Sequence, residues 1–285
     1  MPEFLALMSS FVFGFSHVFA KMGMRWSNPF TGAVISIFVS ALLFWLGVLV
    51  FIPFSSFRTT AIFYFVIAGM FAPALGRFFN YMGIHRVGVS RATPITAIAP
   101  LFSITIAILF VGEKITIPIV LGTLLIILGA ILLSHKKKED LQWRKLDLIY
   151  PAFGALCFGI SYNLRKLGLL HVSSPLIAAA VTTTSGFVFL LACSLPSRRG
   201  NTLQFKTQGL FYLVLGGFFS GIASLLSYFA LNLGNIVVVS PLTNIFPLFS
   251  IALSAVFLRD VETINRWIIT GALVTVVGVI FIALR

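Results

Sequence analysis

A cluster of polar residues interrupts one of the apolar stretches of the sequence. Arg77, Asn80 and Tyr81 are spaced so that they share one face of a helix. An ionised side chain deep inside a membrane-spanning helix is costly, which makes it a candidate functional group. The planar guanidinium group binds carboxylates and phosphates through paired hydrogen bonds. The cluster therefore predicts a site for an anionic or zwitterionic ligand. Alternatively, Arg77 extends toward the membrane surface or braces free backbone carbonyls.

A similar polar face recurs in the second half of the chain, but without the charge. Ser224 and Tyr228 stand where the first half has Arg77 and Tyr81. A cavity built from both faces would hold one cation among many neutral hydrogen-bonding groups. Its expected ligand would carry a carboxylate or a phosphate.

Further polar residues lie inside other apolar runs. His17 is central in the first run, where it either relays protons or packs against its neighbours. Asn244 either contacts the ligand or joins two helices. Tyr162 occupies the position of His17 in the second half, with Asn163 beside it. The predicted substrate-binding residues are Arg77, Asn80, Tyr81, His17, Tyr162, Asn163, Ser224, Tyr228 and Asn244.

A pair of prolines occurs twice within apolar segments. The sequence TPITAIAPLFSI contains Pro94 and Pro100, and the related SPLTNIFPLFSI contains Pro241 and Pro247. An interior proline removes a helix hydrogen bond, which a membrane segment tolerates where the freed carbonyls face protein or a water-filled cavity. Packing kinks without a functional part are the alternative. The predicted cavity-wall and hinge residues are Pro94, Thr96, Pro100, Pro241, Thr243 and Pro247.

The composition predicts the elements that position these residues. Hydrophobic residues make up 59% of the 285 and charged residues only 9%, whereas soluble domains are about a quarter charged. Apolar runs of about 20 residues can cross a bilayer as helices. We therefore expect an all-α, multi-pass protein of the cell membrane with ten transmembrane helices. The expected spans are 3–20, 31–52, 60–84, 92–111, 116–134, 148–167, 175–195, 209–232, 237–258 and 266–284.

The second half of the chain repeats the first. Gly69 and Thr96 align with Gly216 and Thr243, in the same order as the prolines. The expected organisation is a first five-helix repeat at 1–135, a basic linker at 136–147 and a second repeat at 148–285. Because five is odd, the second repeat would cross the membrane in the opposite sense. Inverted repeats of this kind are typical of transporters that expose a central site alternately to each side.

Several motifs resemble the EamA family of the drug/metabolite transporter superfamily. They are the passage YMGIHRVGVSRA before a fourth-helix proline and FVGEKI at the end of that helix. The second copy departs from the pattern, because Arg259 and Asp260 stand where the first has Gly112 and Glu113. The resemblance implies a carrier with two inverted five-helix repeats, often an exporter of amino acids or related metabolites.

The net charge of +13 would suit a nucleic-acid partner, but the placement of the charges does not. Lys and Arg gather at helix ends and in the linker, which indicates membrane topology and contact with anionic lipid headgroups. The loops after the odd-numbered spans carry most of them, so the charges predict both termini outside. The family resemblance implies termini in the cytoplasm. The expected partners are a small-molecule substrate and membrane lipid, with no nucleic acid and no indicated oligomeric state.

The residues that an enzyme or a metal site would need are missing from the predicted spans. The spans contain no nucleophile with its base, no metal cluster and no carboxylate pair, so we expect neither an enzyme nor a bound cofactor or metal. The acidic residues avoid the middle of the spans, which favours exchange or uniport over proton coupling. A lipid or lipophilic-drug flippase or efflux carrier on the same fold, and less readily a channel, remain as alternatives.

Overall fold

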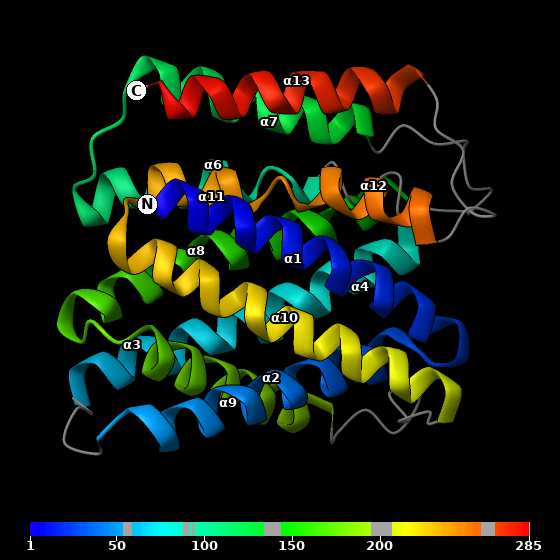
Figure 1. The fold of residues 1–285 in the computed structure, drawn as a ribbon, viewed down its shortest axis with the longest axis vertical. Helices are drawn as coiled ribbons and strands as arrows, with labels where there is room; N and C mark the ends of the chain where they lie inside the picture. The colour runs from blue at the N-terminus through cyan, green and yellow to red at the C-terminus, as the bar shows by residue number, and fades with distance from the viewer. Residues whose placement is uncertain are drawn as a thin grey trace.

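The computed structural model describes residues 1–53, 59–87, 92, 95–133, 144–194, 207–257 and 266–284, and these form helices and short connections without strands. Figure 1 shows the helices running side by side, with both termini at one end. The elements are α1 (Pro2–Gly23), η1 (Met24–Trp26), α2 (Pro29–Phe51), α3 (Thr59–Gly69), η3 (Met70–Leu75), α4 (Gly76–Val87), α6 (Ala99–Ile106), η4 (Ala107–Val111), α7 (Ile117–Leu133), η5 (Lys145–Leu148), α8 (Ile149–His171), α9 (Pro175–Ser194), α10 (Thr207–Leu233), α11 (Ile236–Thr243), α12 (Phe246–Phe257) and α13 (Arg266–Ala283).

Seven helical segments among the described residues are long and apolar enough to cross a membrane. They are Pro2–Trp26, Phe30–Phe51, Thr59–Asn80, Pro175–Ala192, Thr207–Leu233, Ile236–Leu253 and Arg266–Ala283. Shorter apolar helices occupy Ala99–Val111 and Ile117–Leu133. The α8 helix, which carries Arg165 and Lys166, fills the remaining position at which the sequence predicts a span. Most of the predicted basic linker lies outside the described residues.

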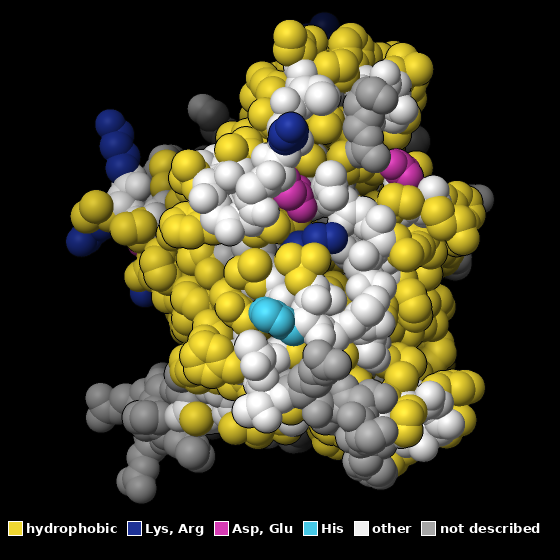
Figure 2. Space-filling model, turned by 90° about the vertical axis from the view of Figure 1, so that its left-hand side faces the viewer, with side chains coloured by type: hydrophobic (Ala, Val, Ile, Leu, Met, Phe, Trp, Pro, Cys, Tyr) yellow, Lys and Arg dark blue, Asp and Glu magenta, His cyan; other side chains and the backbone are white. Residues whose placement is uncertain are grey.

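The surface has the character of a membrane protein. Large apolar side chains are widely exposed on the helix flanks, including Leu124 of α7 at 50% and Leu273 of α13 at 62%. Figure 2 views the end at which both termini lie, where hydrophobic side chains cover much of the outline and many polar groups lie toward the middle, while some Lys and Arg side chains project at the left margin. This distribution matches lipid around the flanks and water at the ends.

Equivalent glycines join the two halves through equivalent contacts. A Cβ atom on Gly14 of α1 would lie 2.9 Å from Cβ of Phe249 in α12. A Cβ atom on Gly159 of α8 would lie 2.7 Å from Cβ of Phe102 in α6. The sequence repeat aligns Gly14 with Gly159 and Phe102 with Phe249. The contact of α1 with α12 is therefore equivalent, under the repeat, to the contact of α8 with α6.

The last helices of the two halves, α7 and α13, pack as a pair along one edge of the molecule (Figure 1). A Cβ atom on Gly122 would lie 2.6 Å from the carbonyl oxygen of Gly278, and one on Gly129 would lie 2.8 Å from that of Gly271. Only glycine permits so close an approach of two backbones. The sequence repeat exchanges these two contacts, because it aligns Gly122 with Gly271 and Gly129 with Gly278.

The helices that carry the paired prolines are broken at matching positions. The Ile98 N–H donates to the Ile95 carbonyl at 3.2 Å, and the Ile245 N–H donates to the Leu242 carbonyl at 3.5 Å. Both bonds reach three residues back instead of the four of an α-helix. The regular helices resume at Ala99 and Phe246, each one residue before a proline. The first turn is where a helix tolerates proline, because its missing N–H has no partner there.

Candidate functional site

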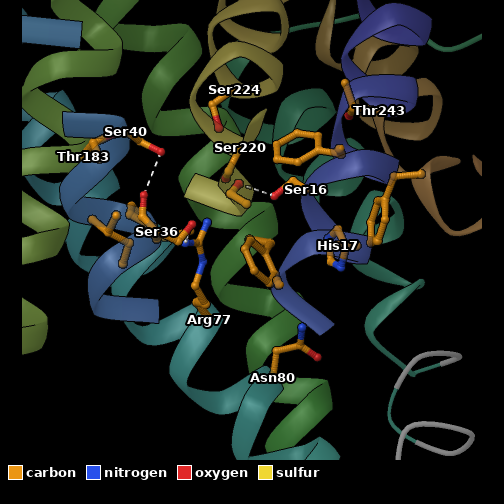
Figure 3. A pocket seen from close by; sticks show the side chains of 18 of the residues that line it. Ser16, His17, Ser36, Ser40, Arg77, Asn80, Thr183, Ser220, Ser224 and Thr243 are labelled. Carbon is orange, nitrogen blue, oxygen red and sulfur yellow. Dashed lines mark hydrogen bonds between the residues drawn. The ribbon is translucent and has the colours of Figure 1, made fainter. Parts of the chain in front are cut away.

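A cavity of about 200 Å³ lies between the two halves. Side chains from α1, α2, α4, α8, α9, α10 and α11 reach it, together with single residues at the helix breaks (Figure 3). Its lining combines hydroxyl and amide groups with apolar side chains such as Phe13, Ile37, Phe158, Leu213 and Phe246. The polar lining residues are Ser16, His17, Ser36, Ser40, Arg77, Asn80, Thr96, Tyr162, Arg165, Thr183, Ser220, Ser224, Tyr228, Thr243 and Asn244.

Arg77 projects from the first turn of α4 into this cavity (Figure 3). Its Nη1 donates to Ser36 Oγ of α2 at 3.3 Å. One turn further along α4, Asn80 Oδ1 accepts a hydrogen bond from Thr96 Oγ1 at 2.9 Å. Arg77 and Asn80 thus face the cavity together, as their spacing predicts. The Tyr81 side chain lies outside the described part of the structure.

A second arginine lines the same cavity, so the prediction of a single cation is wrong. Arg165 belongs to α8 and lies near the end of the predicted span 148–167. Its guanidinium carbon lies 5.1 Å from the ring centre of Tyr228 and 5.7 Å from that of Tyr162. Both separations allow cation–π attraction. The repeat places Ala20 opposite Arg165, so the repeat pattern gave no signal for this charge.

A break in the third span provides an anchor for Arg165. Pro73 lacks an N–H, and Ala72 before it adopts extended backbone angles of φ −151° and ψ 127°. The Ala72 carbonyl, which leaves the helical pattern at this extended residue, accepts from Arg165 Nη2 at 2.8 Å and from Ser161 Oγ at 3.2 Å. The missing N–H of Pro73 is the one that would otherwise bond to the Gly69 carbonyl, four residues earlier. In the second half, α10 is continuous through the matching position.

The second half supplies a connected set of hydroxyl groups. The Tyr162 hydroxyl lies 2.7 Å from Thr243 Oγ1 and 3.3 Å from Ser227 Oγ. Ser224 and Tyr228 line the cavity from the neighbouring helix α10. The hydroxyl contacts hold the Tyr162 ring in place beside the Arg165 guanidinium.

Two predicted residues near the α11–α12 break also reach the cavity. The His17 ring stacks on Phe246, with 4.6 Å between the ring centres. Asn244 lines the cavity while its Nδ2 donates to the Ser240 carbonyl at 2.9 Å. Asn244 therefore reaches the cavity, and its described side-chain hydrogen bond lies within its own helix and does not join two helices.

The structure places other predicted residues away from the cavity. Asn163 is buried between α8 and α6, where its Nδ2 donates to the carbonyls of Ser103 and Gly159, both at 2.9 Å. This use of Asn163 differs from the predicted contact with substrate, because its side chain leaves α8 toward α6. Pro100, Pro241 and Pro247 do not line the cavity. Pro94 lies outside the described residues.

The helix breaks bring Thr96 and Thr243 to the cavity wall in place of the prolines. The prolines stand four residues later, at Pro100 and Pro247, where each removes the N–H that would bond to the threonine carbonyl. The Thr243 hydroxyl is itself bonded within α11 and to Tyr162. The repeated phrase therefore shapes the backbone, while its threonines contact the cavity.

Sequence reasoning missed several small hydroxyl residues of the lining. Ser36 and Ser40 lie one turn apart on α2, and Ser40 Oγ also donates to the Gly217 carbonyl at 3.0 Å. Ser16 Oγ donates to the Gly216 carbonyl at 2.8 Å. Ser16 aligns with Ser161 in the repeat. A search for polar pairs at equivalent repeat positions would have found Ser16.

The acidic side chains of the described residues are engaged elsewhere. Glu3 contacts the N-terminal ammonium at 3.3 Å, and Asp147 accepts from the Arg144 N–H at 2.8 Å. Glu113 Oε1 and Oε2 accept from the N–H groups of Ile236 and Val237 at 2.9 and 3.0 Å. The cavity lining in the described structure has no carboxylate. Within the same residues, no group of three or more His, Cys, Asp or Glu could hold a metal ion.

Glu113 belongs to a polar junction at the turn between α10 and α11. Its carboxylate satisfies the first N–H groups of α11, where the helix dipole favours a negative charge. Gly112 permits the preceding turn, with φ at +76°. Lys166 Nζ donates to the carbonyls of Leu231 and Gly234 at 2.9 and 2.7 Å. Lys166 therefore satisfies backbone carbonyls at the end of α10.

Comparisons with known proteins agree with this architecture. The family model of the EamA-like transporter family matches residues 1–135 and 147–284. An uncharacterized protein of Methanocaldococcus jannaschii is 27% identical over 130 residues, which cover 46% of this chain and 90% of that protein. One crystal structure superposes with a TM-score of 0.81 over 98% of this chain and 96% of its own, at 14% identity. This last likeness bears on the fold alone.

Proposed function

Because the chain belongs to the EamA-like transporter family, we propose that it carries a small anionic or zwitterionic metabolite across the membrane by alternating access. The family consists of transporters and not of enzymes, and the apolar helices make this chain a multi-pass membrane protein. The substrate would bind in the cavity between the halves, and transport would run as export or exchange.

The proposal includes ten membrane crossings in two inverted repeats. The seven long apolar segments, the two shorter ones and α8 supply the ten helical units. The exchanged glycine contacts at Gly122 with Gly278 and at Gly129 with Gly271 are those expected of two halves related by a two-fold axis. Two such halves can exchange conformations and so open a central site to one side and then to the other.

The observation that carries the proposal is Arg77 in a cavity rich in hydroxyl groups. A guanidinium group among neutral donors and acceptors binds a carboxylate or phosphate with defined geometry. Apolar side chains share the lining with these groups, but two guanidinium groups and many hydroxyl groups face the cavity. This arrangement favours a polar cargo over the lipid or lipophilic drug of a flippase.

A thermal-shift screen of the purified protein tests the proposal. Amino acids, organic acids and phosphorylated metabolites are compared, because a ligand of the folded state raises its stability by mass action. We expect stabilisation by members of one anionic or zwitterionic class, followed by saturable uptake of that class into proteoliposomes. Stabilisation by lipids or lipophilic drugs alone would favour the flippase, and uptake that does not saturate would favour a channel.

A further inference from the structure

Each half of the molecule contributes one guanidinium group to the cavity, from a different helix. Arg77 comes from α4 in the first half and Arg165 from α8 in the second. The sequence repeat sets Ser224 opposite Arg77 and Ala20 opposite Arg165, and both of these small residues also line the cavity. The two charges are therefore not copies of each other, and the pair exists only where the halves meet.

The environment of Arg165 orients its guanidinium group and leaves donors available. An arginine side chain carries five N–H donors. The described contacts of Arg165 engage only its Nη2, with the Ala72 carbonyl, and its side chain lines the cavity. The rings of Tyr162 and Tyr228 lie close to the guanidinium carbon. A guanidinium group that is held in place and lines a cavity is suited to bind an anion through its remaining N–H groups.

The charge of the described cavity lining is unbalanced toward the positive. It includes Arg77 and Arg165 and no carboxylate. Confining two like charges in a small cavity inside a membrane protein is unfavourable, and a ligand of opposite charge relieves that cost. A ligand with one negative charge would compensate only one of the two positive charges. The ammonium group of a zwitterion would meet no carboxylate among these lining residues.

We propose that the substrate is a small dianion, a dicarboxylate or a phosphate monoester, bound by Arg77 and Arg165 together. This inference rests on the transport function proposed above and names the class of its substrate. The cavity of about 200 Å³ restricts the ligand to a small metabolite. Arg165 is then the residue that distinguishes a dianion from a monoanion.

Ligand titrations followed by thermal unfolding test this assignment. The probes are succinate and glycerol 3-phosphate as dianions, butyrate as a monoanion of similar size to succinate, and alanine as a zwitterion. We expect the Kd of at least one dianion to be about tenfold or more below those of butyrate and alanine, since one additional ionic contact is worth about that factor. The two dianions distinguish a dicarboxylate site from a phosphate site.

Variants assign the preference to Arg165. Arg165→Gln should raise the Kd of the preferred dianion about tenfold and leave that of butyrate nearly unchanged. Arg165→Lys should retain part of the preference, and it remains informative if the glutamine variant fails to fold. Lys145→Gln is the matched control, because Lys145 is exposed and lies outside the cavity.

Three results would overturn the assignment. They are equal affinity for dianions and monoanions, no stabilisation by either dianion, and an unchanged preference in both Arg165 variants. A dianion that binds as expected but is never taken up by proteoliposomes would contradict the transport function and leave the binding site intact. Saturable uptake of alanine without dianion binding would contradict only the assignment of the dianion.

Discussion

At the scale of single residues, the cavity depends on two arginines whose surroundings differ. Arg77 donates to a serine hydroxyl on α2, whereas Arg165 binds a backbone carbonyl and lies against two tyrosine rings. The described contact of Arg77 is thus with a neutral hydroxyl group, as expected for a residue of a ligand-binding site. Arg165 also stabilises the broken third span through the Ala72 carbonyl, so its replacement affects folding more.

We predict that Arg77→Ala abolishes ligand-dependent thermal stabilisation while the protein remains folded and monodisperse. Arg77→Lys should recover the stabilisation poorly, because the ammonium group lacks the planar fork of guanidinium. Size-exclusion chromatography and ligand titration are the measurements. Arg266→Ala is the control, since Arg266 is exposed and stacks on Trp267 outside the cavity. Unchanged ligand stabilisation in Arg77→Ala would exclude Arg77 from the site.

The sequence allowed much of this site to be predicted, because polar side chains in apolar helices have few acceptable positions. Arg77, Asn80 and Ser224 were found from their helix face, and all three line the cavity. Arg165 was missed for a physical reason. A cation near a helix end usually reaches the headgroups, and only the tertiary contact with Ala72 turns this one inward.

At the scale of elements, breaks in the helices determine which backbone groups face the cavity. The repeated proline phrase predicts the two matching breaks, since proline cannot donate within a helix. The sequence could not predict the junction of Glu113 and Lys166 with the ends of α10 and α11. That junction forms only when α8 and the turn after η4 pack against the ends of α10 and α11, which are distant in the sequence.

We predict that Glu113→Gln lowers the thermal unfolding temperature of the detergent-solubilised protein. The neutral amide loses the charge that interacts with the α11 dipole and one of two acceptors, a loss of about 1 kcal/mol. Lys114→Gln is the matched control, because Lys114 is the exposed neighbour. Equal unfolding temperatures for Glu113→Gln and the wild type would mean that the two hydrogen bonds contribute nothing to stability.

We predict that Pro100→Ala and Pro247→Ala each slow substrate exchange severalfold, with affinity changed by no more than a few-fold. Restoring a helix hydrogen bond at either break biases the equilibrium between two conformations without altering contacts to the ligand. Exchange rates in proteoliposomes measure the effect. Pro175→Ala is the control, since Pro175 begins α9, where proline does not break a helix. Wild-type rates in both variants would reduce these prolines to packing residues.

At the scale of the whole molecule, two copies of one sequence pattern form a single cavity at their interface. The duplication was visible in the sequence, and the exchanged glycine contacts follow it. The lining is nevertheless asymmetric, because Arg77 and Arg165 lack charged counterparts. An asymmetric cavity can bind its ligand in one orientation. The two repeats around it can still exchange conformations during transport.

The distribution of charge predicts that both termini lie outside and the linker lies in the cytoplasm. The inward position of Arg165 strengthens this prediction, because it removes a cation from the side that already carries fewer. A cysteine introduced by Lys145→Cys, in a background with Cys157→Ala and Cys193→Ala, should resist a membrane-impermeant maleimide in intact cells. The same cysteine should react after permeabilisation. Labelling in intact cells would place the linker outside.

The most direct test of the central claim is counterflow in proteoliposomes, with the anion that stabilises the purified protein most. Vesicles loaded with unlabelled anion should take up the labelled anion with saturable, trans-stimulated kinetics, because the site faces one side at a time. Arg77→Ala vesicles should show only background uptake. Flux that rises linearly with concentration and ignores the internal anion, or equal uptake by Arg77→Ala, would contradict an alternating-access carrier with its anion site in this cavity.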